Sequence, residues 1–386
     1  MSKASLTPLE MLARLVAFDT TSSKSNLELI DFVCDHLEGL GWRVALTRDD
    51  EGMKANIWAT AGPDDLPGLV LSGHTDVVPV TGQPWTCDPF RLTEKEDCVF
   101  GRGTTDMKGF IALALSEIGS LDIRRLEAPI HLALTYDEEV GCHGARRLLS
   151  ALPTDRPKPE LVLVGEPTSL GVVVSHKGLQ AYETRIEGRA AHSSRPDLGC
   201  SAVRIGAEIV RFLEELAESR RASAEPGEFE PPYTTVNVGR IDGGTAINII
   251  PRECRLVWEY RPLPGERPSE IREQVDAFIA EKLPADENGL PRIETRTLAE
   301  VPAFPAQKSS PAVAFAKSVL GEESERTVSY TSEAGLFQAA GVPAVVCGPG
   351  DVAQAHQPDE FLSLEQLAAG GRMIREALRR YVTPPG

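Results

Sequence analysis

The stretch LVLSGHTD at residues 69–76 decides the fold of this chain of 386 residues. Its apolar start and polar end predict a buried strand with a polar tip, which is the usual place for ligands in an open α/β sheet. His74 and Asp76 stand two residues apart, so in extended backbone their side chains share a face. The carboxylate can accept the second N–H of the imidazole and orient its other nitrogen toward a metal. A polar turn after a strand is the alternative.

Similar apolar runs recur along the chain and are separated by helical patterns. Helices are predicted from Thr7 onward, at 26–40 and at 108–121, and strands at 42–48, 55–60, 68–72, 130–135, 161–164 and 344–347. Strands that are apolar throughout and alternate with helices indicate an α/β sheet covered on both faces.

The pattern changes near residue 177. Strand, helix, strand, strand, helix and strand are predicted in turn at 180–187, 201–218, 235–241, 253–261, 269–282 and 292–297. This order is typical of a small ferredoxin-like α+β domain. The earlier signals return from about residue 302. We therefore expect an α/β domain formed by residues 1–176 and 302–386, with a second domain, 177–301, inserted into it.

Charge and cysteine content limit the class of protein. Acidic residues outnumber basic ones by 57 to 40, giving a net charge of -17, which argues against nucleic acid and anionic membrane as partners. No apolar stretch approaches the length of a membrane span. Seven scattered cysteines without a CxxC pair indicate reduced thiols. The start MSKASLTPLEMLARLVAF lacks the pattern of a signal peptide. We expect a soluble, cytoplasmic protein.

Two further polar segments carry carboxylates next to predicted elements. Asp106 lies in the glycine-flanked loop GRGTTDMKG before a helix; the loop lacks the spacing of a phosphate loop, so nucleotide binding is poorly supported. An N-cap aspartate is the alternative to a metal ligand there. Residues 137–139 are three successive carboxylates after strand 130–135. Their repulsion in a confined site would be resolved by metal ions. A solvated acidic turn is the alternative.

Two more donors follow predicted strands. Glu166 comes directly after strand 161–164, and His356 follows strand 344–347 through a glycine-rich turn. Histidine and carboxylate donors without thiolates suit Zn, Co or Mn in a catalytic site that holds water. Each of these segments has an unremarkable alternative, but their joint placement at strand ends favours a metal site.

The segments SGHTDVVP, GRGTTDMKG, TYDEEVG, GEPT, AHSSRP, GGTAINIIP and AHQPDE, in this order, resemble the motifs of the M20 metallopeptidase family, and the resemblance runs from about residue 8 to residue 382. It implies a zinc-exopeptidase-like catalytic domain with an inserted ferredoxin-like domain that serves for dimerisation or as a lid. It also implies a homodimer that hydrolyses linear amides of small N-acyl amino acids with two Zn²⁺ ions, for which Co²⁺ can substitute.

The resemblance also assigns metal ligands. His74 and Glu166 would bind one ion, and Glu139 and His356 the other. Asp106 would bridge the two ions.

Further roles follow from the same resemblance. Glu138 is expected to be the general base and Asp76 the partner that orients His74. His192 of AHSSRP would reach the active site of the partner subunit and help polarise the scissile carbonyl. Substrate contacts are expected from Asn248 and from Arg261, the latter to a carboxylate.

One segment bears on the substrate. TSEAG at residues 331–335 resembles the acetylornithine deacetylase branch of the family, as does the Gly-Pro-Gly turn at 348–350. Glu333 can pair with the free amine of N2-acetyl-L-ornithine, and such a pair discriminates against acidic analogues. A glutamate that caps the following helix is the alternative.

The expected reaction is therefore hydrolysis of N2-acetyl-L-ornithine to L-ornithine and acetate, in arginine biosynthesis. Another hydrolase of the family is the alternative, such as a succinyl-diaminopimelate desuccinylase, an aminoacylase or a dipeptidase. A non-catalytic metal-binding relative is the alternative from a different class, but the presence of Glu138 beside a complete ligand set speaks against it.

Overall fold

The structure is a computed structural model that describes residues 6–307 and 309–382. Residues 1–5 and 383–386, which the predicted α/β domain includes, lie outside the described residues, as does the start of the segment inspected for a signal peptide. The chain forms two compact units, and the second is inserted into the first. The first comprises Met1–Val174, Ala306–Arg326 and Ser332–Gly386, and the second Ser175–Pro305 and Thr327–Thr331.

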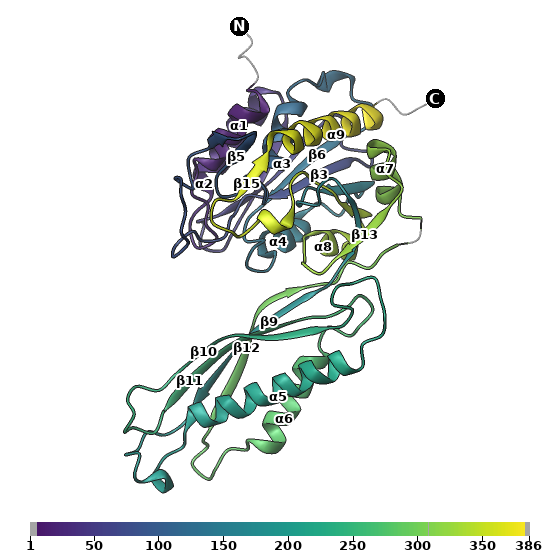
Figure 1. Ribbon diagram of the computed structural model, residues 1–386. Coiled ribbons are helices and arrows are strands. Elements are labelled where there is room, and N and C mark those ends of the chain that lie inside the picture. Colours follow the sequence, from purple (N-terminus) through teal and green to yellow (C-terminus); the bar gives the residue numbers. More distant parts are fainter. Residues whose placement is uncertain (1–5, 308, 383–386) are drawn as a thin grey trace. The chain divides into compact units, whose positions relative to one another are not determined.

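The first unit is built on an eight-stranded sheet with the order β1-β2-β6-β3-β7-β14-β8-β13 (Figure 1). Its four central strands, β6, β3, β7 and β14, are parallel, whereas β1, β2 and β8 pair antiparallel to their neighbours. The strands span β1 Arg43–Arg48, β2 Ala55–Ala61, β3 Leu69–His74, β6 Ile130–Thr135, β7 Leu161–Val164, β8 Val172–His176, β13 Glu325–Val328 and β14 Ala344–Val346. A separate three-stranded sheet joins β4 Thr93–Lys95, β5 Cys98–Phe100 and β15 Phe361–Ser363.

Helices cover this sheet: α1 Pro8–Val16, α2 Leu27–Gly39, α3 Lys108–Ile118, α4 His143–Ala151, α7 Pro311–Leu320, α8 Ala334–Ala339 and α9 Leu364–Val382. Helix α1 begins with a capping box, in which the Thr7 hydroxyl accepts the Glu10 N–H and the Glu10 carboxylate accepts the Thr7 N–H. The predicted coverage of both faces holds for the central strands but not for β1, the edge strand, which is largely exposed.

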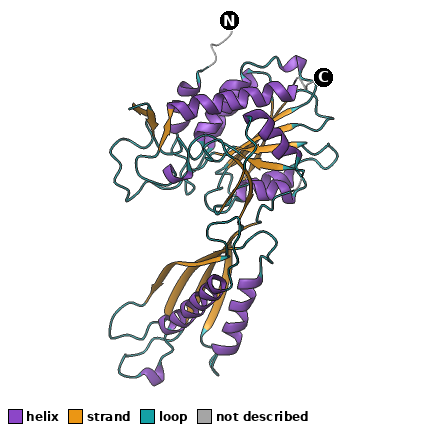
Figure 2. Ribbon diagram, turned by 45° about the vertical axis from the view of Figure 1, so that its right-hand side comes forward, coloured by secondary structure: helices purple, strands orange, loops and turns teal. Residues whose placement is uncertain are grey.

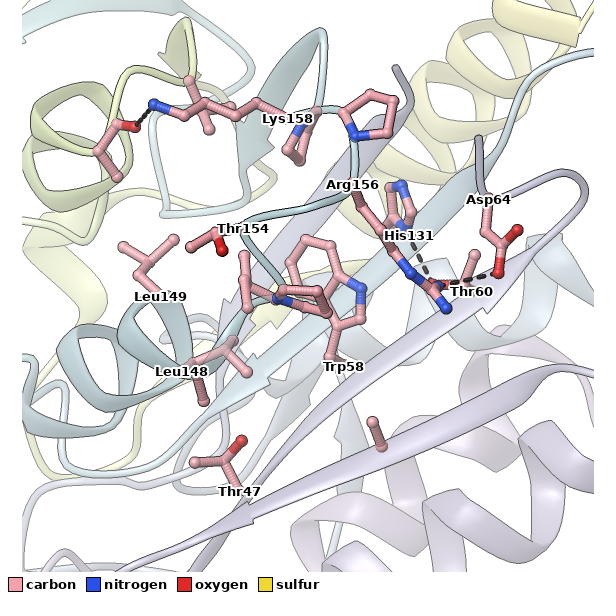
Figure 3. A pocket seen from close by; sticks show the side chains of 18 of the residues that line it. Thr47, Trp58, Thr60, Asp64, His131, Leu148, Leu149, Thr154, Arg156 and Lys158 are labelled. Carbon is pink, nitrogen blue, oxygen red and sulfur yellow. Dashed lines mark hydrogen bonds and ion pairs between the residues drawn. The ribbon is translucent and has the colours of Figure 1, made fainter. Parts of the chain in front are cut away.

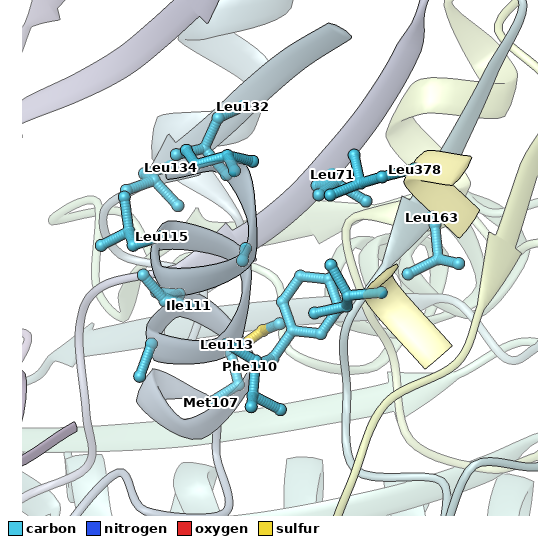
Figure 4. Packing of buried hydrophobic residues seen from close by; sticks show 14 of the residues in the cluster. Leu71, Met107, Phe110, Ile111, Leu113, Leu115, Leu132, Leu134, Leu163 and Leu378 are labelled. Carbon is cyan, nitrogen blue, oxygen red and sulfur yellow. The ribbon is translucent and has the colours of Figure 1, made fainter. Parts of the chain in front are cut away.

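Helix α3 is the centre of the core. It is apolar nearly all round and buried along its length, because α1 and α9 pack beside it and β3 lies beneath it. Figure 4 shows Phe110 and Leu113 of this helix close to Leu71 of β3 and Leu378 of α9. This packing positions the loops that follow β3, β6 and β7.

The second unit has the predicted order of strands and helices. Its elements are β9 Leu179–Glu187, α5 Ala202–Ala222, β10 Thr235–Gly243, β11 Glu253–Arg261, α6 Glu270–Lys282 and β12 Arg292–Val301. The sheet order is β10-β11-β9-β12 with antiparallel neighbours, and both helices pack on one face (Figure 2). This is the ferredoxin-like arrangement, so the predicted fold class is confirmed.

Residues 327–331 belong to the second unit although they lie beyond the range predicted for it. Three hydroxyls attach this segment to backbone carbonyls of that unit. Thr327 donates to Glu228, Ser329 donates to Glu230 at 2.6 Å, and the Thr331 hydroxyl donates to the carbonyl of residue 177 at 3.0 Å.

Candidate metal centre

The ends of three parallel strands bring the predicted ligands together. His74 is the last residue of β3, the acidic turn 137–139 follows β6, and Glu166 follows β7. Because β3 pairs in parallel with both β6 and β7, their carboxyl ends meet at one edge of the sheet. His74 and Glu166 are buried, at 1% and 5% exposure.

Asp106 lies between the two histidines. Its Oδ1 is 3.0 Å from His74 Nε2, and its Oδ2 is 3.3 Å from His356 Nε2. Glu139 Oε2 lies 2.9 Å from His356 Nε2, and Glu166 Oε1 lies 3.9 Å from His74 Nε2. Each histidine therefore faces one oxygen of Asp106 and at least one glutamate oxygen.

The donor atoms fit divalent cations. Ligand atoms of His74, Asp106 and Glu139 lie within 4.8 Å of one another, and so do those of His74, Glu138 and Glu166. Oε1 of Glu139 and Oε1 of Glu166 are buried and have no hydrogen-bond partner among the described residues. Buried polar atoms rarely stay unpaired, so both oxygens mark places for a positively charged ligand. Nitrogen and oxygen donors without thiolate match a catalytic zinc-type site.

The charges of the cluster also favour the binding of cations. Burial and the charge of Asp106 together raise the pKa of Glu139 to about 7, although His356 and His74 oppose this. Burial and the same aspartate also raise the pKa of Glu166 well above its usual range. The pKa of Asp106 is lowered, because hydrogen bonds with His356 and His74 outweigh its burial. Cations between these groups would favour the ionised carboxylates.

Asp76 orients its neighbours in a way that differs from the prediction. His74 Nδ1 lies 2.9 Å from the backbone oxygen of Asp76 and 3.6 Å from its Oδ1, so the main-chain carbonyl is the nearer acceptor. The carboxylate instead accepts the backbone N–H groups of Glu138 and Glu139, at 3.0 and 3.3 Å, and the Ser22 hydroxyl at 2.7 Å. The carbonyl leaves His74 Nε2 directed at the cluster, and the carboxylate fixes the acidic turn.

The three carboxylates of the acidic turn do not share one environment. Asp137 adopts a positive φ of 55° and pairs with Lys54, whose Nζ lies 2.5 and 2.7 Å from its two carboxylate oxygens. Glu138 turns toward the cluster, with Oε2 at 4.0 Å from His74 Nε2. Burial and neighbouring carboxylates raise the pKa of Glu138 well above its usual range, although His74 opposes this. The sequence did not predict the pair with Lys54.

Glu360 is a functional residue for which the sequence analysis predicted no role. Its buried Oε1 accepts the backbone N–H groups of Thr105 and Asp106, at 2.9 and 3.0 Å. Its Oε2 accepts the Gly103 N–H at 2.9 Å and the Arg102 guanidinium at 2.7 Å. An irregular loop at 101–106 needs acceptors for its backbone N–H groups, but its sequence does not reveal a partner more than 250 residues away.

Glu333 occupies the N-cap position of α8, but its side chain caps no helix N–H. The side chain is 1% exposed, and its oxygens accept the hydroxyls of Thr135 and, at 3.0 Å, Ser72. It therefore links the ends of β6 and β3. Its predicted contact with substrate stays a prediction.

The remaining candidates lie in the second unit. His192 is exposed, and its Nδ1 lies 2.8 Å from the Ser194 hydroxyl and 3.2 Å from the Ser194 backbone nitrogen. Asn248 is exposed and lies in a loop, and its backbone carbonyl accepts the Ser193 N–H at 3.0 Å. Arg261 is partly buried, with Nε 3.1 Å from Glu259.

Comparison with known proteins agrees with this fold. Residues 70–380 match the family model of peptidase family M20/M25/M40. Acetylornithine deacetylase of Pasteurella multocida is 36% identical over 97% of this chain and 98% of its own length. The enzyme of the same name from Myxococcus xanthus is 37% identical over 96% of each chain. A metallo-carboxypeptidase of the M20 family from Sulfolobus solfataricus shares the fold at a TM-score of 0.76 and 20% identity, over 97% of this chain and 99% of its own.

This chain belongs to peptidase family M20 and is a hydrolase that acts on amides. Among the described helices, none combines the length and the apolar character that crossing a bilayer requires. All seven cysteines are free.

We expect Glu360→Ala to lower metal affinity by about 10- to 100-fold, because the loop that carries Asp106 loses its acceptor. Metal content after dialysis and the midpoint of thermal unfolding measure the effect. Glu360→Gln keeps one carbonyl oxygen and should lie between Ala and the parent. Glu365→Gln, an exposed glutamate in the first turn of α9, is the matched control. Parental metal affinity in Glu360→Ala would contradict this role.

Proposed function

We propose that this chain hydrolyses N2-acetyl-L-ornithine to L-ornithine and acetate, as a step of arginine biosynthesis. The observation that carries the proposal is the similarity, over nearly the whole chain, to relatives named acetylornithine deacetylase at 36–37% identity. The cluster of two histidines and carboxylates at one sheet edge supports the amide hydrolysis itself. Hydrolysis of another N-acyl amino acid is the second candidate.

Two Zn²⁺ ions are proposed as cofactors, with Co²⁺ able to substitute. His74 and Glu166 would hold one ion and Glu139 and His356 the other, with Asp106 shared. The support is that the two oxygens of Asp106 face different histidines, at 3.0 and 3.3 Å. When bound, such ions polarise a substrate carbonyl and lower the pKa of water.

The residues of the chain would then move the proton. Glu138 is proposed as the general base that accepts a proton from water and delivers it to the leaving amide nitrogen. Its support is a carboxylate that faces the cluster at 4.0 Å from His74 Nε2 and has a raised pKa, since a base with too low a pKa would bind the proton weakly. Asp76 would keep Glu138 in place because its carboxylate accepts a hydrogen bond from the Glu138 backbone N–H at 3.0 Å.

The second unit is proposed to complete the site in a homodimer. The exposed imidazole of His192 suits an oxyanion of the partner subunit's substrate, and Asn248 and Arg261 are proposed to contact that substrate. Exposed apolar side chains at Leu198, Ile241, Ile247 and Ile249 support an interface there. Sedimentation at micromolar concentration should give the mass of a dimer, and a monomer mass would contradict this assembly. A cytoplasmic location stays a prediction.

Glu138→Gln should keep the metal content of the parent while kcat falls by about 10²- to 10⁴-fold, because the variant keeps its size but cannot accept a proton. Metal analysis and steady-state turnover of the same preparation measure both quantities. Asp137→Asn, in the neighbouring carboxylate that pairs with Lys54 instead of facing the cluster, is the matched control and should keep most activity. Turnover at the parental rate in Glu138→Gln would exclude it as the base.

A competitive turnover assay tests the substrate. Zinc- or cobalt-loaded protein is offered N2-acetyl-L-ornithine, N-succinyl-LL-diaminopimelate and N-acetyl-L-methionine together. We expect the highest kcat/KM for N2-acetyl-L-ornithine. A higher value for either competitor would sink the assignment to arginine biosynthesis while leaving the amide hydrolase in place.

Glu333→Gln then separates two roles of this carboxylate. If its charge recognises the amine of ornithine, the preference for N2-acetyl-L-ornithine over N-acetyl-L-methionine should fall by about tenfold or more. If it only links β3 and β6 through Ser72 and Thr135, both substrates should lose kcat/KM equally. An unchanged preference would therefore contradict substrate recognition by Glu333.

A further inference from the structure

A cavity of about 560 Å³ lies in the first unit, at the opposite end of the sheet from the metal ligands (Figure 3). His131, which lines it, is the second residue of β6, whereas the acidic turn follows the last residue of that strand. Other lining residues come from segment 153–159, which precedes β7, and from Val342, which precedes β14. The cavity is therefore separate from the cluster at the carboxyl ends of the strands.

The floor of the cavity is a face of the sheet. Ala45 of β1 pairs with Trp58 of β2, and in the next row Arg43 pairs with Thr60, which in turn pairs with His131 of β6. Directly opposed residues point to the same face, so these side chains lie together. The Trp58 ring packs on the His131 ring at 4.9 Å between centroids.

Helix α4 is too short to cover this floor. Helix α4 has only nine residues and ends at Ala151, after which the chain continues as a loop with prolines at 153, 157 and 159. Figure 3 shows Leu148 and Leu149 of α4 to one side of Trp58, and Arg156 on the other. The result is an apolar slot with an aromatic floor.

The rim of the slot is cationic. Arg43, Arg156 and Lys158 line it against one carboxylate, Asp64, in a chain whose net charge is -17. Both arginines approach that carboxylate, Arg156 at 2.9 Å and Arg43 at 3.8 Å. Lys158 donates to a backbone carbonyl at 2.8 Å. Because a carbonyl carries no net charge, this contact does not neutralise the ammonium group. Three cations against one anion leave a net positive rim.

We infer that this cavity binds a small planar organic anion, an aromatic or heteroaromatic carboxylate. Its ring would stack on Trp58, and its anionic group would lie at the arginines. The volume falls in the range of small-molecule sites, about 300–1,000 Å³. This binding is additional to the proposed hydrolysis, because it needs no metal ligand and N2-acetyl-L-ornithine offers no ring.

Calorimetric titration of the full, metal-loaded chain with 2-naphthoate tests the inference. We expect saturable binding at one site. Trp58→Ala should weaken it by about tenfold or more through loss of the aromatic floor, and Arg156→Glu by about tenfold through the reversed charge. Arg125→Glu makes the same change in net charge at an exposed arginine of the first unit that pairs with Asp122, so it should bind as the parent does.

Four outcomes would overturn the inference: no saturation at millimolar 2-naphthoate, parental affinity in both pocket variants, equal affinity for the uncharged 2-naphthylmethanol, or displacement of the probe by N2-acetyl-L-ornithine. The last would place the probe at the metal cluster. Arg156 is exposed, so Arg156→Glu should unfold at the temperature of the parent and keep the comparison valid if Trp58→Ala folds poorly.

Discussion

Repulsion among carboxylates gathered at one sheet edge is the constraint that shapes the rest of the first unit. Asp106, Glu138, Glu139 and Glu166 surround a space in which the two histidines are the nearest positive partners. Burial makes the ionised forms costly, as the raised pKa of Glu139 shows. The fold must therefore hold these groups against their own repulsion, and the surrounding hydrogen bonds do so.

Two further carboxylates serve as anchors for backbone. Asp76 accepts N–H groups of the acidic turn, and Glu360 accepts N–H groups of the loop that carries Asp106. Each fixes a predicted ligand through its main chain and leaves the side chain free for the cluster. A site held in this way is preorganised, since a ligand placed by backbone needs little rearrangement to bind a cation. Lys54 adds to this order by holding Asp137 away from the cluster.

Sequence patterns predicted the parts of this arrangement that depend on neighbours along the chain. The apolar runs at 69–72, 130–135 and 161–164 predicted central strands. The polar residues after them predicted where the candidate site lies, because the carboxyl ends of parallel strands meet at one edge of the sheet. The contacts of Glu360 and Lys54 could not be predicted, since they join residues 254 and 83 positions apart. Contacts over such separations depend on the tertiary packing of segments that are far apart in the chain.

Family resemblance supplied what local patterns lacked, namely the pairing of ligands and the roles in the second unit. His356 Nε2 lies 2.9 Å from Glu139 Oε2 and 3.3 Å from Asp106 Oδ2, and the pairing of ligands stays a prediction. The nearer partner of His74 Nδ1 is nevertheless the main-chain carbonyl of Asp76, at 2.9 Å against 3.6 Å for its carboxylate. A two-residue spacing indicates a shared face, but it does not decide which oxygen of that residue accepts the proton.

The position of Glu360 in the chain also orders events during synthesis. The segments with His74, Asp106 and Glu139 leave the ribosome before the inserted second unit, whereas His356 and Glu360 follow it. Until those residues emerge, the N–H groups of Gly103, Thr105 and Asp106 lack the Glu360 carboxylate, and the cluster lacks one histidine. The cluster of a growing chain thus stays incomplete while the inserted unit is translated. A nascent chain that stops there lacks the complete set of donors that a metal ion would need.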